Sequence, residues 1–289
     1  MGCTTCRRLY KMKVICLDAF KYDYLDHTPF LRSLTKKYQH GRLKVPLGFE
    51  GGMDSFFRGK KSDIIALFCR SYASPYRWTR YFHFLPRIII DIKINIQKLL
   101  KNHRRFHRTR YIPKKKIQYF DTAVNKIPQQ YINFDYRWIG IIDKLGHKYG
   151  PNSREIKDAL KKLDRQLEKE DFDLIMSDHG MMEVKEYVEV PETDICFIDS
   201  TMARYWDRKP EISTNKGRWI KGSEKFGRYI FVANPGVVFL PNYWDGSNKV
   251  KGMHGYAPPC SEIDGFYILK REGKKKDLKI SDLNRYIRR

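Results

Sequence analysis

Residues 173–180 read DLIMSDHG, and this stretch decides the fold class. The short, mainly apolar run of residues 173–176 is typical of a buried strand, and it ends at Ser177, Asp178 and His179. A second run, MKVICL at residues 12–17, likewise ends at Asp18. Open α/β sheets bind ligands at the carboxyl ends of their strands. Both stretches therefore predict a sheet with polar side chains gathered at one edge.

Strands and helices alternate over much of the chain. The pattern predicts helices at residues 28–38 and 153–170, the second with Ser153 as N-cap, and further strands at residues 138–142, within 229–239 and at 266–269. This alternation favours an α/β fold with a central, mostly parallel sheet flanked by helices. We expect one domain over residues 1–289.

The composition indicates a globular protein. Of the 289 residues, 42% are hydrophobic and 31% charged, which is not a disordered composition. No apolar run is long enough to span a membrane, and the N-terminus lacks the apolar segment of a secretory signal. The six cysteines are scattered apart from Cys3 and Cys6, so we expect reduced thiols and a cytoplasmic location. Met12, just before the first expected strand, is an alternative start to Met1.

The net charge of +24 favours anionic partners. Residues 70–116 hold fourteen Lys or Arg residues and one acid, Asp91, so we interpret residues 70–117 as a basic helical insertion. Its amphipathic part could lie on an anionic membrane surface, or its basic face could simply point to water. Interleaved tyrosines and arginines could also bind single-stranded nucleic acid, a partner that the pattern favours less.

Six aspartate and histidine side chains in the sequence could ligate metal. Each alone has a simpler explanation, since an aspartate at a strand end is often a helix N-cap and a single histidine often lies on the surface. Together they form a mixed oxygen and nitrogen set, which suits zinc, manganese or iron better than a thiolate-loving site. Six ligands suffice for two ions about 4 Å apart, the arrangement used in phosphoryl transfer. They are Asp18, Asp143, His147, Asp178, His179 and His254.

Three motifs together resemble a known family. DKLGHKYGP at residues 143–151, SDHGM at 177–181 and GMHGY at 252–256 are similar, in order and spacing, to the type I phosphodiesterase/nucleotide pyrophosphatase branch of the alkaline phosphatase superfamily. Asp18, followed by TPFLRSL at residues 28–34, fits the same pattern. The resemblance spans about residues 12–270 except the basic segment, and it implies an alkaline-phosphatase-like fold. It also implies two metal sites, one of Asp143, His147 and His254 and the other of Asp18, Asp178 and His179.

The family's nucleophile is the point of departure. A Thr or Ser that attacks phosphorus is expected within PLGFEGGMDSFFRG, residues 46–59. Here Phe49 or Glu50 occupies that position, and Glu50 aligns better because a Gly-aromatic pair precedes it. Three explanations remain open: attack by a metal-activated water with Glu50 as ligand or base, attack by Ser55 after a shift of register, or a site that binds without turnover.

The sequence therefore predicts a phosphoesterase with two divalent metal ions, zinc or alternatively manganese. Its substrate would be an anionic phosphodiester or pyrophosphate, such as a nucleotide, a nucleotide-sugar or a lipid-linked phosphate. The alternative is a catalytically inactive relative that binds an anionic ligand, a membrane surface or nucleic acid. The cytoplasmic protein could then be peripheral to a membrane.

Overall fold

The computed structural model describes residues 11–48, 51–60, 134–194, 196–223, 227–240 and 249–287. Its central sheet has six strands in the order β14-β2-β13-β4-β1-β3. Strand β1 pairs in parallel with β3 and β4, whereas β13 pairs antiparallel with β4 and β2. The bounds are β1 Lys13–Leu17, β2 Tyr38–Lys44, β3 Asp135–Ile139, β4 Leu174–Met176, β13 Gly265–Glu272 and β14 Leu278–Lys279. The predicted α/β fold with a mostly parallel sheet is confirmed.

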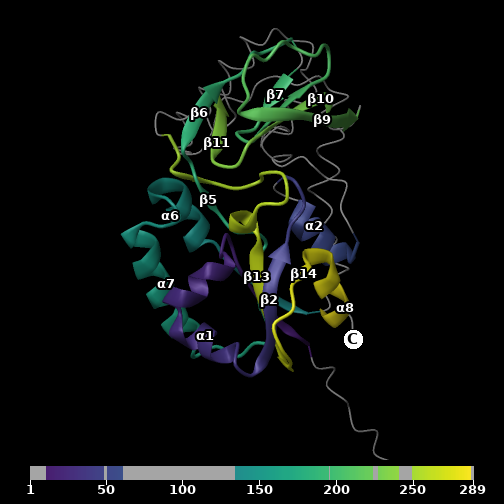
Figure 1. Ribbon diagram of the computed structural model, residues 1–289. Helices are drawn as coiled ribbons and strands as arrows, with labels where there is room; N and C mark the ends of the chain where they lie inside the picture. The colour runs from purple at the N-terminus through teal and green to yellow at the C-terminus, as the bar shows by residue number, and fades with distance from the viewer. Residues whose placement is uncertain are drawn as a thin grey trace, which may run out of the picture.

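Helices cover both faces of this sheet (Figure 1). Successive strand residues point to opposite faces, so Val14 and Cys16 of β1 enter one hydrophobic core while Ile15 and Leu17 enter the other. The first core packs against α2 (Gly51–Arg58) and α8 (Asn284–Ile287), and the second against α1 (Pro29–Leu34), α6 (Ile141–Tyr149) and α7 (Arg154–Leu167). This burial on both faces explains why β1 and β4 are continuous apolar runs.

A second group of strands lies above the central sheet in Figure 1. Four of them form an antiparallel sheet in the order β7-β8-β10-β9, while β6 pairs with β11 and β5 with β12. The bounds are β5 Met182–Glu183, β6 Glu186–Glu189, β7 Cys196–Ile198, β8 Met202–Tyr205, β9 Gly217–Ser223, β10 Gly227–Ala233, β11 Val237–Leu240 and β12 Gly252–Met253. Strands β10 and β11 are those expected within residues 229–239. Between them Gly236 has a φ of 86°, which suits a glycine turn.

Several predicted bounds are corrected. The first helix ends at Leu34 instead of residue 38, because Tyr38 begins β2. Strand β3 ends at Ile139, and Ile141 begins α6, so the strand predicted at residues 138–142 lies too far along the chain. The strand predicted at residues 266–269 is β13, which is longer and runs from Gly265 to Glu272, and β14 follows it.

The helix predicted at residues 153–170 is α7, and its predicted N-cap is confirmed. The Ser153 side chain accepts a hydrogen bond from the Ile156 N–H, and the helix ends at Leu167. Among the described residues no helix is both long and apolar enough to cross a membrane. The basic segment of residues 70–117 lies outside the described residues, so its predicted helix and membrane contact stay predictions.

Candidate metal centre

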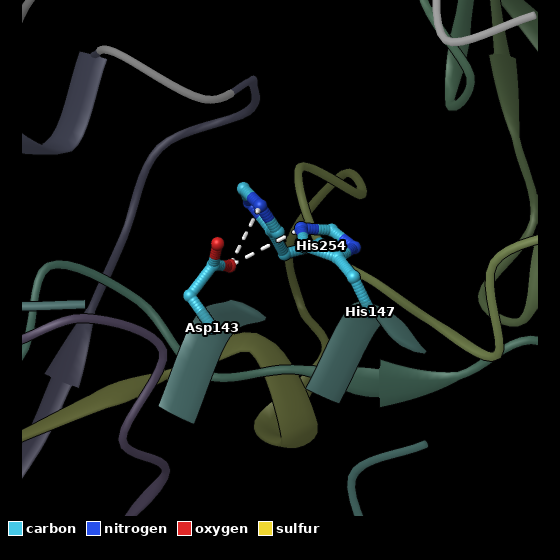
Figure 2. A group of neighbouring side chains, drawn as sticks. All are labelled: Asp143, His147 and His254. Atoms are coloured by element: carbon cyan, nitrogen blue, oxygen red, sulfur yellow. Dashed lines mark ion pairs between the residues drawn. The ribbon is translucent and has the colours of Figure 1, made fainter. Parts of the chain in front are cut away.

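The first predicted ligand group, Asp143, His147 and His254, comes together in the structure (Figure 2). Asp143 and His147 lie four residues apart on α6, a spacing that places both on one face of a helix. His254 follows β12 and points back toward them. Asp143 Oδ1 lies 3.2 Å from His147 Nε2 and 3.6 Å from His254 Nε2. One carboxylate oxygen thus faces two imidazole nitrogens.

The second predicted group is Asp18, Asp178 and His179. Asp18 follows β1, and the other two follow β4, the neighbouring parallel strand. His179 Nε2 lies 3.1 Å from Asp178 Oδ2 and 3.5 Å from Asp18 Oδ1. In each group one potential ligand atom per residue lies within 4.8 Å of the others. The stacked rings of His179 and His254, with centroids 3.7 Å apart, join the two groups into one centre.

Backbone carbonyls orient two of the imidazoles. His147 Nδ1 lies 2.8 Å from the carbonyl oxygen of Gly252, and His179 Nδ1 lies 2.8 Å from that of Gly180. A carbonyl oxygen only accepts, so each Nδ1 donates to it, and Nε2 is the ring nitrogen that faces the carboxylates and is placed to ligate a metal. This arrangement is usual for metal-ligating histidines.

The buried charges strongly perturb the protonation of the centre. Burial, together with the nearby carboxylates of Asp178 and Asp143, raises the pKa of Asp18 to about 9. Burial opposes protonation of His179, but the carboxylates of Asp178 and Asp18 outweigh it and raise its pKa to about 10. Burial and the two neighbouring histidines lower the pKa of His254 well below its usual value. His254 is therefore neutral, the form in which histidine binds metal.

The loop after β1 is fixed by contacts to the loop after β4. Ala19 has a φ of 60°, a left-handed conformation that costs energy for a residue with a Cβ. In this conformation the Ala19 N–H donates to Asp178 Oδ1 at 3.3 Å, and the Phe20 N–H donates to Ser177 Oγ at 3.0 Å. The Ser177 hydroxyl in turn donates to the carbonyl of His179. Sequence reasoning missed this role of Ser177, because no local pattern reveals a bond between segments so distant in the chain.

Of the three residues considered for the role of the nucleophile, the structure describes only Ser55. Phe49 and Glu50 lie outside the described residues. Ser55 lies on α2 with an exposure of only 2%, as expected for a helix residue facing the core. The N-terminal end of α2 approaches the second ligand group, since a Cβ added to Gly52 would lie 3.1 Å from the carbonyl oxygen of Asp178.

The residues present suit divalent metal ions. They offer three carboxylates and three imidazoles, and Asp18, Asp178, His179 and His254 are at most slightly exposed. Aspartates and histidines together suit zinc or manganese, and two groups this close suit a pair of ions. Burial, together with the carboxylates of Asp178 and Asp143, disfavours the ionised form of Asp18 and raises its pKa, and a cation would offset both effects.

Comparisons with known proteins agree with this geometry. The sequence model of the family "Type I phosphodiesterase / nucleotide pyrophosphatase" matches residues 72–210. Among solved structures, murine ectonucleotide pyrophosphatase/phosphodiesterase 5 is similar with a TM-score of 0.61 and 14% identity, over 96% of this chain and 94% of that one. An inactive variant of the murine protein in complex with AMP gives 0.60 and 15%, over 96% and 93% of the two chains.

The human ectonucleotide pyrophosphatase/phosphodiesterase 5 gives a TM-score of 0.58 at 17% identity, over 96% of this chain and 94% of that one. At these identities the structural likeness concerns the fold. No curated protein sequence matches the chain. The family match and the fold agree with the three sequence motifs and confirm the predicted resemblance of this chain to the type I phosphodiesterase/nucleotide pyrophosphatase branch of the alkaline phosphatase superfamily.

Proposed function

We propose that the chain is a metal-dependent phosphoesterase that hydrolyses a phosphodiester or pyrophosphate bond. The observation that carries this proposal is the meeting of six ligands from four separate segments in two adjoining groups. The family is metal-dependent, typically with two metal ions, and its members are hydrolases of phosphate esters and pyrophosphates, which supports the same reaction class.

Each side chain has a role in this proposal. Asp143, His147 and His254 hold one ion, and Asp18, Asp178 and His179 hold the other. When bound, two ions supply stabilisation of the negative charge on the phosphoryl oxygens and lower the pKa of the attacking water. The protein contributes the orientation, because the carbonyls of Gly252 and Gly180 fix two of the imidazoles.

Glu50 is the candidate for the role that a hydroxyl normally takes. It directly precedes α2 in the chain, and the first turn of α2 lies against the backbone of Asp178. A carboxylate there can ligate metal or accept a proton from water, but it is a poor acceptor of a phosphoryl group. We therefore assign Glu50 as base or ligand in a direct attack by water, and not as a covalent nucleophile.

The substrate class follows from charge and family. A protein with a net charge of +24 attracts anions, and an anionic phosphorylated substrate of the nucleotide, nucleotide-sugar or lipid-linked type fits. The metal centre would recognise the phosphoryl group and not the rest of the substrate, so we propose a substrate class and not one compound. The cytoplasmic location stays a prediction.

A second candidate function is binding without turnover, which the missing hydroxyl favours. In this alternative the same centre holds metal and an anionic phosphate ligand. The two functions differ in what chelation and loss of a ligand abolish. Both treatments stop hydrolysis in the first function and release the phosphate ligand without prior turnover in the second, whereas an anion attracted by surface charge alone stays bound through both and binds more weakly with salt.

The test combines metal content with hydrolysis. Purified protein is analysed for bound metal, and hydrolysis of an aryl phosphodiester is measured with and without chelator. His254→Ala removes one ligand, and His27→Ala, at an exposed position of the 3-10 helix at Tyr22–His27, is the matched control. We expect two equivalents of metal and turnover that chelator and His254→Ala abolish but His27→Ala keeps.

Glu50→Ala and Glu50→Thr then address the attacking group. Glu50→Ala should abolish turnover if Glu50 is base or ligand. Recovered turnover with a trapped phosphoryl-enzyme in Glu50→Thr would show that only the nucleophile had been lost. Bound metal without turnover on aryl and nucleotide substrates would favour the binding function. Absence of metal after incubation with zinc and with manganese would overturn both.

A further inference from the structure

Trp138 lies beside a proposed metal ligand for a reason set by strand register. Strands β1 and β3 are parallel, with Cys16 opposite Trp138 and Leu17 opposite Ile139. Paired residues point to the same face of a sheet, and so do residues two apart along a strand. Asp18 follows Cys16 by two positions, so its side chain and that of Trp138 lie on the same side of the sheet.

The side chains of β3 reach two residues further along β1. Tyr136, paired with Val14, lies next to the thiol of Cys16. Trp138 repeats this step one pair later, and its indole nitrogen lies near the carboxylate of Asp18. The repeat shows that the proximity of Trp138 to Asp18 follows from the same two-residue offset between β3 and β1.

The backbone leaves room for this contact at Gly140. A Cβ added to Gly140 would lie 3.3 Å from Trp138 Nε1 and 3.4 Å from Asp18 Oδ2. The other carboxylate oxygen, Oδ1, lies 3.5 Å from His179 Nε2. The indole nitrogen is therefore near Oδ2, while the other oxygen of the same carboxylate contacts the second ligand group.

Packing alone does not account for Trp138. Its side chain is 44% exposed, whereas the other described tryptophans are more buried, with Trp206 at 2%. An indole N–H can only donate, so it can neither ligate a metal nor remove a proton from a neighbour. A neutral donor of this kind holds a carboxylate in place without competing for the ion.

We propose that Trp138 is a positioning residue for the metal ligand Asp18. Its N–H fixes the carboxylate so that Oδ1 faces the ion held with Asp178 and His179. This inference rests on the proposed function, because it assumes that Asp18 ligates metal. Loss of such an outer partner usually weakens metal binding by about 10- to 100-fold. Trp138 also becomes the tryptophan whose fluorescence responds to an ion at this site.

The test is a titration with Zn²⁺ in competition with a chromophoric chelator, on metal-stripped full-length protein. Trp138→Phe keeps an aromatic ring but removes the donor, and Trp219→Phe on β9 is the matched control. We expect wild type and Trp219→Phe to bind two ions with the same affinities. Trp138→Phe should bind one ion as before and the other at least about 10-fold more weakly. The fluorescence change on adding Zn²⁺ should disappear in this variant alone.

Gly140→Ala is a second, independent variant. It retains both partners but places a methyl group between them, and Gly140 has a φ of −99° that alanine adopts without strain. The same one of the two sites should weaken. Circular dichroism and urea unfolding verify that each variant is folded.

The outcomes separate this inference from the proposed function. If wild type binds two ions and both variants bind them equally tightly, the role of Trp138 is refuted while the metal centre stands. If Trp138→Phe weakens both sites equally, the effect is general and the role of Trp138 is again refuted. If wild type binds no Zn²⁺, the proposed function falls first and the inference falls with it.

Discussion

Gly146 offers a sharp test of how the first ligand group is assembled. It lies on α6 between Asp143 and His147. A Cβ added to Gly146 would lie 2.3 Å from Met181 Sδ and 3.1 Å from Met181 Cε. On the opposing strand, a Cβ added to Gly252 would lie 2.5 Å from the carbonyl oxygen of Gly146. The two glycines thus allow α6 to approach β12 closely, which brings His147 within hydrogen-bonding distance of Gly252.

Gly146→Ala sets two effects against each other. Alanine is the better helix former by about 1 kcal/mol. Ordinary contact begins near 3.4 Å, so Met181 Sδ must move by about 1 Å, and Met181 is only 1% exposed in a packed core. Overpacking of this kind costs about 1–3 kcal/mol. We expect a net loss of about 1 kcal/mol in the free energy of unfolding, and a weaker Zn²⁺ site because α6 shifts away from His254.

A double-mutant cycle with Met181→Ala identifies the cause. Met181→Ala alone should cost about 2–5 kcal/mol, as is usual for a buried methionine. In that background the clash is gone, so adding Gly146→Ala should stabilise the protein by up to about 1 kcal/mol. Urea unfolding of the four proteins measures both terms. If Gly146→Ala has the same effect in both backgrounds, or leaves Zn²⁺ affinity unchanged, the close approach of α6 does not shape the site.

Three further predictions follow from single residues. Ala19→Gly relieves the left-handed strain at φ 60° but raises the conformational entropy of the unfolded chain. The net free energy of unfolding should rise by about 0.5 kcal/mol, and a lower urea midpoint would contradict this. Burial raises the pKa of Asp264 to about 6 despite Arg42 and Lys44, so stability should fall as pH rises from about 4 to 6. Because Asp264 is half-buried, this fall should be no more than about 1 kcal/mol, and Asp264→Asn should flatten it in urea unfolding at pH 4 and 7. Ser55→Ala should keep hydrolysis of an aryl phosphodiester, and a loss by several orders of magnitude would make Ser55 the nucleophile.

The sequence identified those parts of the fold in which local pattern and burial agree. Residues 12–17 and 173–176 are apolar throughout because β1 and β4 are covered on both faces, and the strands lie where these runs predict them. Helix α7 was equally clear, since its periodic apolar positions and its Ser153 cap both arise within one segment. The ligands Asp18, Asp178 and His179 could be located because they directly follow these two strands.

Asp143 was predicted for a partly wrong reason. The run WIGII (residues 138–142) suggested a strand that ends at Asp143, but Gly140 leaves the extended conformation and α6 begins at Ile141. A short apolar run does not distinguish a strand from the first turn of a helix. The spacing of four residues between Asp143 and His147 was the better signal, since it places both on one helix face.

Other features depend on contacts that no local pattern contains. Strand β9 reads GRWIKGS and becomes a strand by pairing with β10 across the upper sheet. The hydrogen bond from Phe20 to Ser177 and the proximity of Trp138 to Asp18 join segments that only the fold brings together. Residues of this kind hold the ligands and do not touch the substrate, so no motif of the family's chemistry includes their role.

The electrostatics of the two ligand groups favours bound cations. A folded chain that buries Asp18 beside Asp178 and Asp143 is at odds with its own stability, because burial and the two neighbouring carboxylates disfavour the ionised form of Asp18 and raise its pKa to about 9. The chain nevertheless fixes these side chains with glycine approaches, backbone carbonyls and a strained Ala19. Strain and repulsion gathered at one edge of a sheet are typical of a functional site, since packing alone would not retain them. A pair of cations removes the repulsion, so the arrangement that weakens the metal-free protein is the one that suits a phosphoesterase.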